Sequence, residues 1–177
     1  MHQSDLFEPH ALYASPTVQR DRFAALAPAD LTDGERDSVI HLALRVLEPT
    51  VTYDAFTDAE ATMRYFRLRF AREPHEVFAC AYLDSRHRLI ELVELFRGTI
   101  DGCSVHPRVV AQTALRLNCA RVILAHNHPS GDPTPSAADL RITQRVKSAL
   151  ALFEIDVLDH IVVGREGAVS LAAQGRL

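Results

Sequence analysis

Residues 125–139, AHNHPSGDPTPSAAD, carry the most specific pattern in this chain of 177 residues. They follow CARVILA (119–125), a short and almost wholly apolar run that predicts a strand buried on both faces. Successive side chains of a strand or its extended exit alternate between faces, so we expect His126 and His128 to point the same way. Three prolines and a glycine exclude regular structure from 126–135 and predict a stiff loop.

A helix predicted over 136–152 follows this loop and returns the chain to the two histidines. Ser136 is its expected N-cap, which places Asp139 in the first turn. Two imidazole nitrogens and a carboxylate oxygen are a typical ligand set of a catalytic zinc, with the fourth position left for water. Taken singly, the histidines are ordinary residues of a strand end, and Ser136 with Asp139 has the spacing of a helix cap. Their conjunction predicts that His126, His128 and Asp139 hold one zinc ion per chain.

The segments on either side predict a β-sheet with helices packed on it. Further strands are expected at 76–84, 89–100, 155–163 and 168–172, with turns at 85–87 and 164–167. Pro107 suits the first turn of a helix that runs to Leu117, and Asn118 can close this helix in the left-handed conformation. The expected fold class is α/β, of the α+β type.

The first part of the chain has a helical pattern. Helices are expected at 16–27, 32–48 and 57–72. Thr32 and Glu35 have capping-box spacing at the start of the second helix, and Pro49 is expected to end it. Thr57 and Glu60 repeat the same spacing at the start of the third helix.

Composition limits the classes of function. Lys and Arg total 19 and Asp and Glu total 23, and this net charge of −4 counts against a dedicated nucleic-acid-binding role. Cys80, Cys103 and Cys119 lack paired spacing and are expected to be reduced, buried thiols. No apolar run approaches the roughly 18 residues of a membrane span. The N-terminus lacks a basic segment followed by an apolar one, so we expect no signal peptide and a cytoplasmic protein.

The spacing H-x-H-x7-S-x-x-D resembles the signature of the JAMM (MPN+) zinc metallopeptidases. AHNHPSGDPTPS (125–136) is similar to the RadC-like branch in particular, and LFRGTI (95–100), VHPR (105–108) and LDHIVVG (158–164) fit it as well. The resemblance implies an MPN/JAB-like mixed sheet flanked by helices over 52–177, preceded by a short helical extension at 1–51. It also implies a bound zinc and hydrolysis of a peptide or isopeptide (amide) bond, although nothing in the sequence specifies a particular substrate or oligomeric state.

The resemblance also implies roles for single residues. His126, His128 and Asp139 match the zinc ligands. Ser136 matches the serine whose hydroxyl helps to stabilise the oxyanion formed when water attacks a carbonyl. The family has an upstream glutamate that acts as general base and acid, and Glu76 fits its context best.

Several alternatives remain open at this point. Glu94, just before LFRGTI, is the rival general base. His106 and His160 could line the site, or they could be capping and sheet-packing residues. Asn127 stands where many JAMM enzymes have Ser or Thr. The alternative functions are a DNA-repair-associated RadC-like protein and a non-catalytic zinc-binding interaction domain, although the first 51 residues lack the Gly-rich hairpin of the helix-hairpin-helix region often found in this branch.

Overall fold

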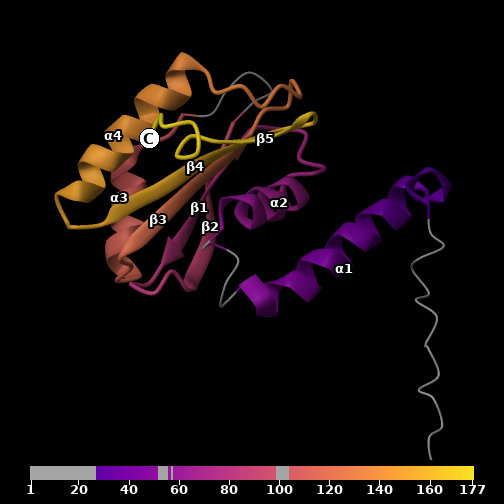
Figure 1. The fold of residues 1–177 in the computed structure, drawn as a ribbon, viewed down its shortest axis with the longest axis horizontal. Coiled ribbons are helices and arrows are strands. Elements are labelled where there is room, and N and C mark those ends of the chain that lie inside the picture. Colours follow the sequence, from indigo (N-terminus) through magenta and orange to yellow (C-terminus); the bar gives the residue numbers. More distant parts are fainter. Residues whose placement is uncertain (1–26, 52–55, 57, 99–103) are drawn as a thin grey trace, which may run out of the picture. The chain divides into compact units, whose positions relative to one another are not determined.

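The structure is a computed structural model that describes residues 27–51, 56, 58–98 and 104–177 (Figure 1). The chain divides into two units, residues 1–36 and 37–177. The described part of the first unit holds a short 3-10 helix, Pro28–Asp30, and the start of helix α1 (Asp33–Val51). The helix expected at 16–27 lies outside the described residues, except for Ala27, which is not helical.

The capping box predicted for α1 is confirmed, but its predicted end is wrong. The Glu35 carboxylate accepts the Thr32 amide at 2.8 Å, and the Glu35 amide donates to the Thr32 hydroxyl at 3.4 Å. The helix continues past Pro49 to Val51. A proline ring fixes φ close to the helical value, so near a helix end it removes one backbone hydrogen bond without changing the direction of the chain.

Helix α2 (Ala59–Arg69) is shorter than predicted and has a different cap. Its N-cap is Asp58, whose carboxylate accepts the amides of Glu60 at 3.2 Å and Ala61 at 3.1 Å. The prediction that Thr57 starts a capping box is therefore wrong. A carboxylate offers two acceptor oxygens and so satisfies two of the free amides of the first turn.

The sheet has five strands in the order β2-β1-β3-β4-β5. These are β1 (Val77–Leu83), β2 (Leu89–Arg97), β3 (Arg121–Asn127), β4 (Asp156–Gly164) and β5 (Gly167–Ser170). β3 and β4 run parallel and the other neighbours run antiparallel, so the sheet is mixed, as expected. Helices α3 (Pro107–Arg116) and α4 (Ala137–Ala151) complete the domain. Pro107 opens α3, and Asn118 adopts the predicted left-handed conformation with φ 49°.

Strand β3 is longer at its carboxyl end than predicted. His126 pairs with Phe78 of β1, and Asn127 pairs with Val163 of β4, so both residues belong to the strand. The prediction that regular structure ends at Ala125 is therefore wrong. The irregular loop begins only at His128, because Pro129 is the first residue that lacks an amide for the ladder.

Helices cover both faces of the sheet (Figure 1). α2 covers one face. Phe66 of this helix and Phe70, just after its end, pack there with Ala79, Ile123 and Ala125. α3 and α4 pack on the other face, against a second cluster: Phe78, Cys80, Tyr82, Val122 and Leu124. His126 continues the alternation of Val122 and Leu124, so its side chain lies on the α3/α4 face.

Two further predictions concern the cysteines and the membrane. Cys80 and Cys119 are buried free thiols, as predicted, and Cys103 lies outside the described residues. Among the helices of the described part, none is both long and apolar enough to span a bilayer.

Candidate metal centre

Three potential ligands converge where β3 ends and α4 begins. His126 Nε2 and His128 Nε2 are 2.9 Å apart. The Asp139 carboxylate has one oxygen 3.3 Å from His126 Nε2 and the other 3.4 Å from His128 Nε2. The side chain of His126 is 1% exposed, that of His128 17% and that of Asp139 13%. The structure therefore brings together the three residues predicted to be ligands, in a place largely removed from water.

The loop after β3 is held by its own backbone hydrogen bonds. The His128 amide donates to the Val163 carbonyl at 2.7 Å, which anchors the loop start to β4. Gly131 has φ 100°, a conformation that favours glycine, and its amide donates to the His128 carbonyl at 3.0 Å. The backbone amide of Glu166, in the β4–β5 turn, donates to the Gly131 carbonyl at 3.1 Å. These bonds fold the loop back over the sheet and bring α4 to the two histidines.

Asp139 serves as a helix cap and faces the histidines at the same time. The Ser136 amide donates to one Asp139 oxygen at 2.7 Å, and the Asp139 amide donates to the Ser136 hydroxyl at 3.2 Å. This is the predicted capping box. The cap fixes the rotamer of the carboxylate, so its lone pairs are directed at the histidines. The capping role and the ligand role are therefore compatible.

The hydrogen bonds of His128 determine which of its nitrogens carries the proton. Its Nδ1 lies 2.8 Å from the Asp132 carbonyl oxygen. A carbonyl only accepts, so Nδ1 carries the proton, and in the neutral ring Nε2 has a free lone pair. This lone pair points at the space between His126 and Asp139.

A buried chain of hydrogen bonds determines which ring nitrogen of His126 carries the proton. The Thr143 hydroxyl donates to the Asp139 carbonyl at 2.5 Å, so its single proton is used there. The Nδ1 of His160, 2.6 Å away, must then donate to the Thr143 oxygen. His160 Nε2 is left as an acceptor, and His126 Nδ1 donates to it at 2.8 Å. His126 Nε2 therefore also carries a lone pair.

The two imidazoles thus direct lone pairs at each other, beside a carboxylate. Such an arrangement requires a cation between them, either a proton or a metal. Zinc–ligand bonds of about 2.0–2.1 Å at tetrahedral angles separate the donor atoms by about 3.3 Å. The two distances from histidine to Asp139 match that separation, and the distance between the histidines is slightly shorter. The residues present fit a zinc ion.

Local pKa shifts agree with this arrangement. Burial, followed by the charges of His126 and His128, lowers the pKa of His160 well below its ordinary value against the opposing charge of Asp139, which keeps the ring neutral and able to accept from His126. The hydrogen bond to Asp139 raises the pKa of His128, and burial opposes this rise. The hydrogen bond to the Asp132 carbonyl and the charges of Asp139 and Glu76 raise this pKa further. Burial alone would raise the pKa of Asp139, but the bonds to the two histidines outweigh it and the pKa is lowered.

Glu76 lies on the same face of the sheet as the histidines. It precedes β1 by one residue, and Phe78, two residues later, packs on the α3/α4 face. Phe78 pairs with His126 in antiparallel register, and continuation of that register brings Glu76 opposite His128. The contribution of Glu76 to the raised pKa of His128 agrees with this placement.

The rival glutamate, Glu94, is engaged elsewhere. Its carboxylate bonds Arg69 at 2.5 Å and Arg97 at 3.4 Å, on the edge strand β2. Glu94 pairs with Ala79, which packs on the α2 face, and cross-strand partners point to the same side. Of the two candidates, Glu76 is the one that the strand register places on the face of the histidines.

His106 does not join this cluster. It precedes α3 without a side-chain capping bond, and its ring packs edge-on against Phe96 with centroids 5.9 Å apart. His160 is the histidine that the structure connects to the site, through His126.

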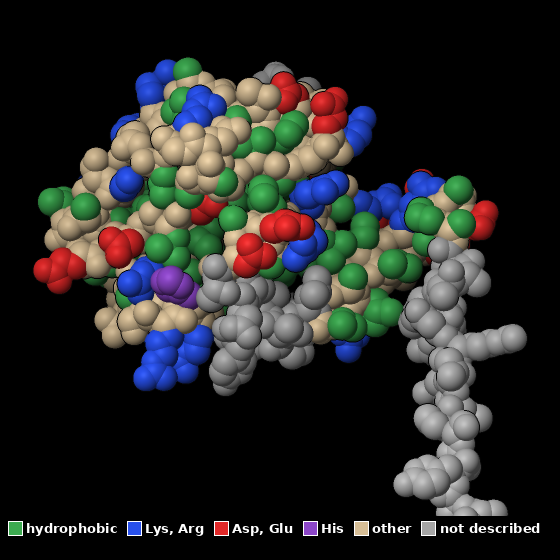
Figure 2. Space-filling view, viewed as in Figure 1, with side chains coloured by type: hydrophobic (Ala, Val, Ile, Leu, Met, Phe, Trp, Pro, Cys, Tyr) green, Lys and Arg blue, Asp and Glu red, His purple; other side chains and the backbone are tan. Residues whose placement is uncertain are grey.

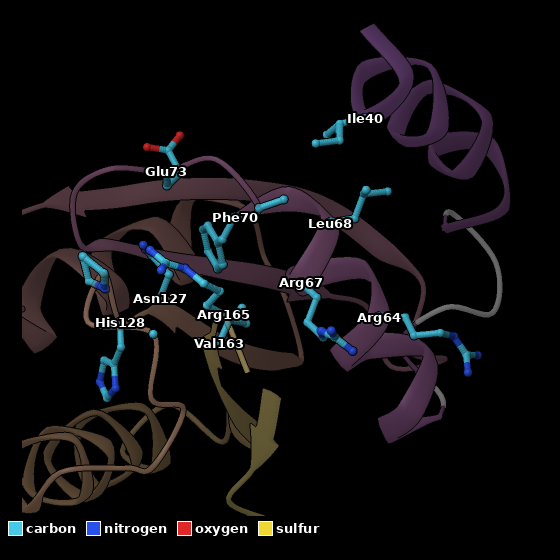
Figure 3. Close-up of a pocket in the computed structure, with 14 residues that line it drawn as sticks. Ile40, Arg64, Arg67, Leu68, Phe70, Glu73, Asn127, His128, Val163 and Arg165 are labelled. Atoms are coloured by element: carbon cyan, nitrogen blue, oxygen red, sulfur yellow. The ribbon is translucent and has the colours of Figure 1, made fainter. Parts of the chain in front are cut away.

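A cavity of about 490 Å³ lies at the same end of the sheet, and the potential ligand His128 is one of its lining residues. Arg67, Phe70, Glu73 and Arg165 are among its lining residues (Figure 3). Figure 3 shows the His128 ring directed away from Phe70 and Glu73. The cavity thus adjoins the cluster of potential ligands at His128.

The loop that carries His128 also depends on a glycine of β4, which gives a first testable prediction. A Cβ on Gly164 would lie 2.2 Å from the Gly131 carbonyl oxygen and 2.6 Å from the Pro133 nitrogen. Gly164→Ala is therefore expected to displace the loop, remove the Asp132 acceptor from His128 and weaken zinc binding by about 10- to 100-fold. Chelator competition with the metal-free protein measures the affinity.

The matched control is Gly167→Ala in the same turn, where an added Cβ meets nothing within 4 Å. It should bind zinc as the wild type does. Equal zinc affinities for Gly164→Ala and Gly167→Ala would contradict this account of the loop.

Fold and site together define a JAB/MPN-type domain, with a mixed sheet between helices and an H-x-H and Asp cluster at the carboxyl end of its central strand. Comparison with known families agrees, because the model of the RadC-like JAB domain matches residues 56–176. The chain belongs to the RadC-like JAB domain family.

Curated bacterial relatives support the assignment. A UPF0758 protein of Vibrio cholerae is 54% identical over 140 residues, which covers 78% of this chain and 88% of that protein. A UPF0758 protein of Nitrosococcus oceani is 54% identical over 139 residues, 78% of this chain and 62% of that protein. A third, from Polaromonas sp., is 52% identical over 141 residues, 79% of this chain and 63% of that protein. The chain thus spans less than two thirds of the latter two relatives.

Proposed function

We propose that this protein is a zinc-dependent hydrolase that cleaves a peptide or isopeptide (amide) bond. The observation that carries the proposal is the convergence of two imidazole lone pairs and a carboxylate oxygen at a nearly buried site, with Glu76 on the same face. His126, His128 and Asp139 would hold the zinc, and the domain that performs the reaction would span 52–177. A zinc ion supplies Lewis-acid polarisation of a carbonyl and acidifies its bound water.

Two side chains of the protein serve the reaction, Glu76 in proton transfer and Ser136 in stabilising negative charge. The Glu76 carboxylate accepts the proton of the attacking water and later delivers it to the leaving amine nitrogen. The Ser136 hydroxyl uses a lone pair to accept the Asp139 amide, so its own proton is available to the oxyanion of the substrate. The helix cap therefore orients the donor as well as the ligand.

The proposal is tested by turnover of fluorogenic peptides and of isopeptide-linked lysine substrates. We expect turnover that a zinc chelator abolishes and that added zinc restores. Ser136→Ala should lower turnover by about 100-fold, as loss of one oxyanion donor does in other hydrolases, and leave the bound zinc in place. Turnover that survives complete removal of zinc would refute the proposal.

The two alternative functions predict other outcomes. A non-catalytic zinc domain would bind zinc and show no turnover that depends on Glu76. A DNA-binding role predicts salt-sensitive association with DNA, which the net charge of −4 does not favour. On the face seen in Figure 2, acidic and basic side chains of the described residues are interspersed. Such a mixture lacks the one-signed surface that tracks a phosphate backbone.

A further inference from the structure

Asn127 lies between the two histidines in sequence and points to the opposite side of the sheet. It is 4% exposed. Both ends of its amide group are used: Oδ1 accepts the Val77 amide at 2.8 Å, and Nδ2 donates to the His75 carbonyl at 2.9 Å. A buried amide with both partners satisfied is a strong local constraint. The two backbone groups that it holds flank Glu76.

The two hydrogen bonds of the Asn127 side chain lie where the backbone pairing of β1 with β3 stops. The pairing of β1 with β3 ends at Phe78 and His126. Beyond that point the amide of His128 donates to the carbonyl of Val163 in β4. The side chain of Asn127 joins the two segments there instead of the main chain.

A third hydrogen bond completes the support of Glu76. The Gly98 amide, just after β2, donates to the Glu76 carbonyl at 2.8 Å. The backbone from His75 to Val77 is therefore held from β3 on one side and from β2 on the other. Glu76 is the central residue of this held segment.

We infer that Asn127 is a positioning residue that holds the Glu76 carboxylate at the metal centre. The inference rests on the proposed function, because it assigns Asn127 to the glutamate that serves as general base there. A serine or threonine in this place carries one short hydroxyl, which cannot reach both the His75 carbonyl and the Val77 amide. An asparagine suits this place between the histidines because its side chain is long enough and its amide both accepts and donates a hydrogen bond.

The test is a double-mutant cycle on zinc affinity, measured by chelator competition with Glu76→Gln, Asn127→Ser and the double variant. Loss of the Glu76 charge should weaken zinc binding by about 3- to 10-fold. Asn127→Ser should weaken it measurably but by no more than that, and an unchanged affinity in Asn127→Ser would overturn the inference. The double variant should match Glu76→Gln, because a carboxylate that is already displaced has nothing further to lose.

Two controls match the two changes. Glu94→Gln removes the same charge from a carboxylate held by Arg69 and Arg97, and should change the affinity by less than about twofold. Ser170→Ala removes the two hydrogen bonds of a buried hydroxyl, to Asp159 and from the Ala173 amide, and should also leave zinc affinity unchanged. Asn127→Thr repeats the Asn127→Ser test with a residue that favours strands, in case the serine variant does not fold.

The outcomes separate this inference from the proposed function. Independent, multiplicative losses for Asn127→Ser and Glu76→Gln would overturn the inference, because they would mean that Asn127 acts on the histidines and not through Glu76. Unchanged zinc affinity in Glu76→Gln would also overturn it, because the carboxylate would then not reach the site. Absence of zinc binding by the wild type would overturn the proposed function itself.

Discussion

Glu76→Gln is expected to reduce amide hydrolysis by about 100- to 10,000-fold while zinc remains bound. The amide of glutamine has nearly the shape of the carboxylate but cannot accept the proton of the attacking water. None of the three potential ligands is altered, so the metal centre should persist. The measurement is steady-state turnover beside zinc content determined on the same preparation.

Glu94→Gln is the control for this experiment, because it removes the same charge from the rival glutamate. Its carboxylate is engaged with Arg69 and Arg97 on the edge strand, so turnover should stay within about twofold of the wild type. A large loss in Glu94→Gln with none in Glu76→Gln would reverse the assignment. Wild-type turnover in Glu76→Gln would contradict the proposed mechanism.

His160→Leu is expected to weaken zinc binding by about 10- to 100-fold, the usual cost of losing a group that orients a metal ligand. His160 is fully buried and accepts the Nδ1 proton of His126. Leucine cannot accept, so the buried N–H of His126 loses its partner, at a cost of about 1–3 kcal/mol. Chelator competition on the folded, metal-free protein measures the change.

A matched pair of variants separates orientation from simple loss of packing. His160→Gln places a carbonyl oxygen near the position of the lost Nε2 and should keep zinc affinity within a few-fold of the wild type. Thr143→Val keeps the shape of the side chain but removes the oxygen that fixes the His160 proton, and should weaken binding by about 10-fold. Equal affinities for His160→Leu and His160→Gln would contradict the role of His160 in orienting His126.

The parts of the site that local rules control were predictable from the sequence. Strand alternation placed His126 and His128 on one side, and capping chemistry placed Asp139 in the first turn of α4. Helix caps were less certain where two candidates compete, as at the start of α2, where Asp58 and not Thr57 is the cap. Proline signals marked the loop after β3 but placed its start two residues too early.

The supporting residues were hidden for a different reason, because they depend on pairing between distant segments. A bulge in β4 skips Leu158, so that Ile123 pairs with Asp159 and Leu124 with His160. The bulge shifts the alternation and turns His160 to the face of His126. No periodic pattern in the sequence shows that shift. Thr143 could have been found, since it lies one turn after Asp139 on the same face of α4.

Asn127 was noticed in the sequence only as a departure from the commoner Ser or Thr. Its partners, His75 and Val77, lie 52 and 50 residues earlier in the chain. Their proximity follows from the β1–β3 pairing, which a single sequence does not specify. The same pairing distinguishes Glu76 from Glu94, so the general base also depended on the register of the sheet.

The most direct test of the metal centre is elemental analysis of protein purified without a metal-affinity tag. Wild type is compared with the double variant His126→Ala, His128→Ala. We expect about one zinc per chain in the wild type and none in the double variant, because two of the three ligands are lost. No zinc in the wild type, even after incubation with zinc at neutral pH, would contradict the assignment of this site.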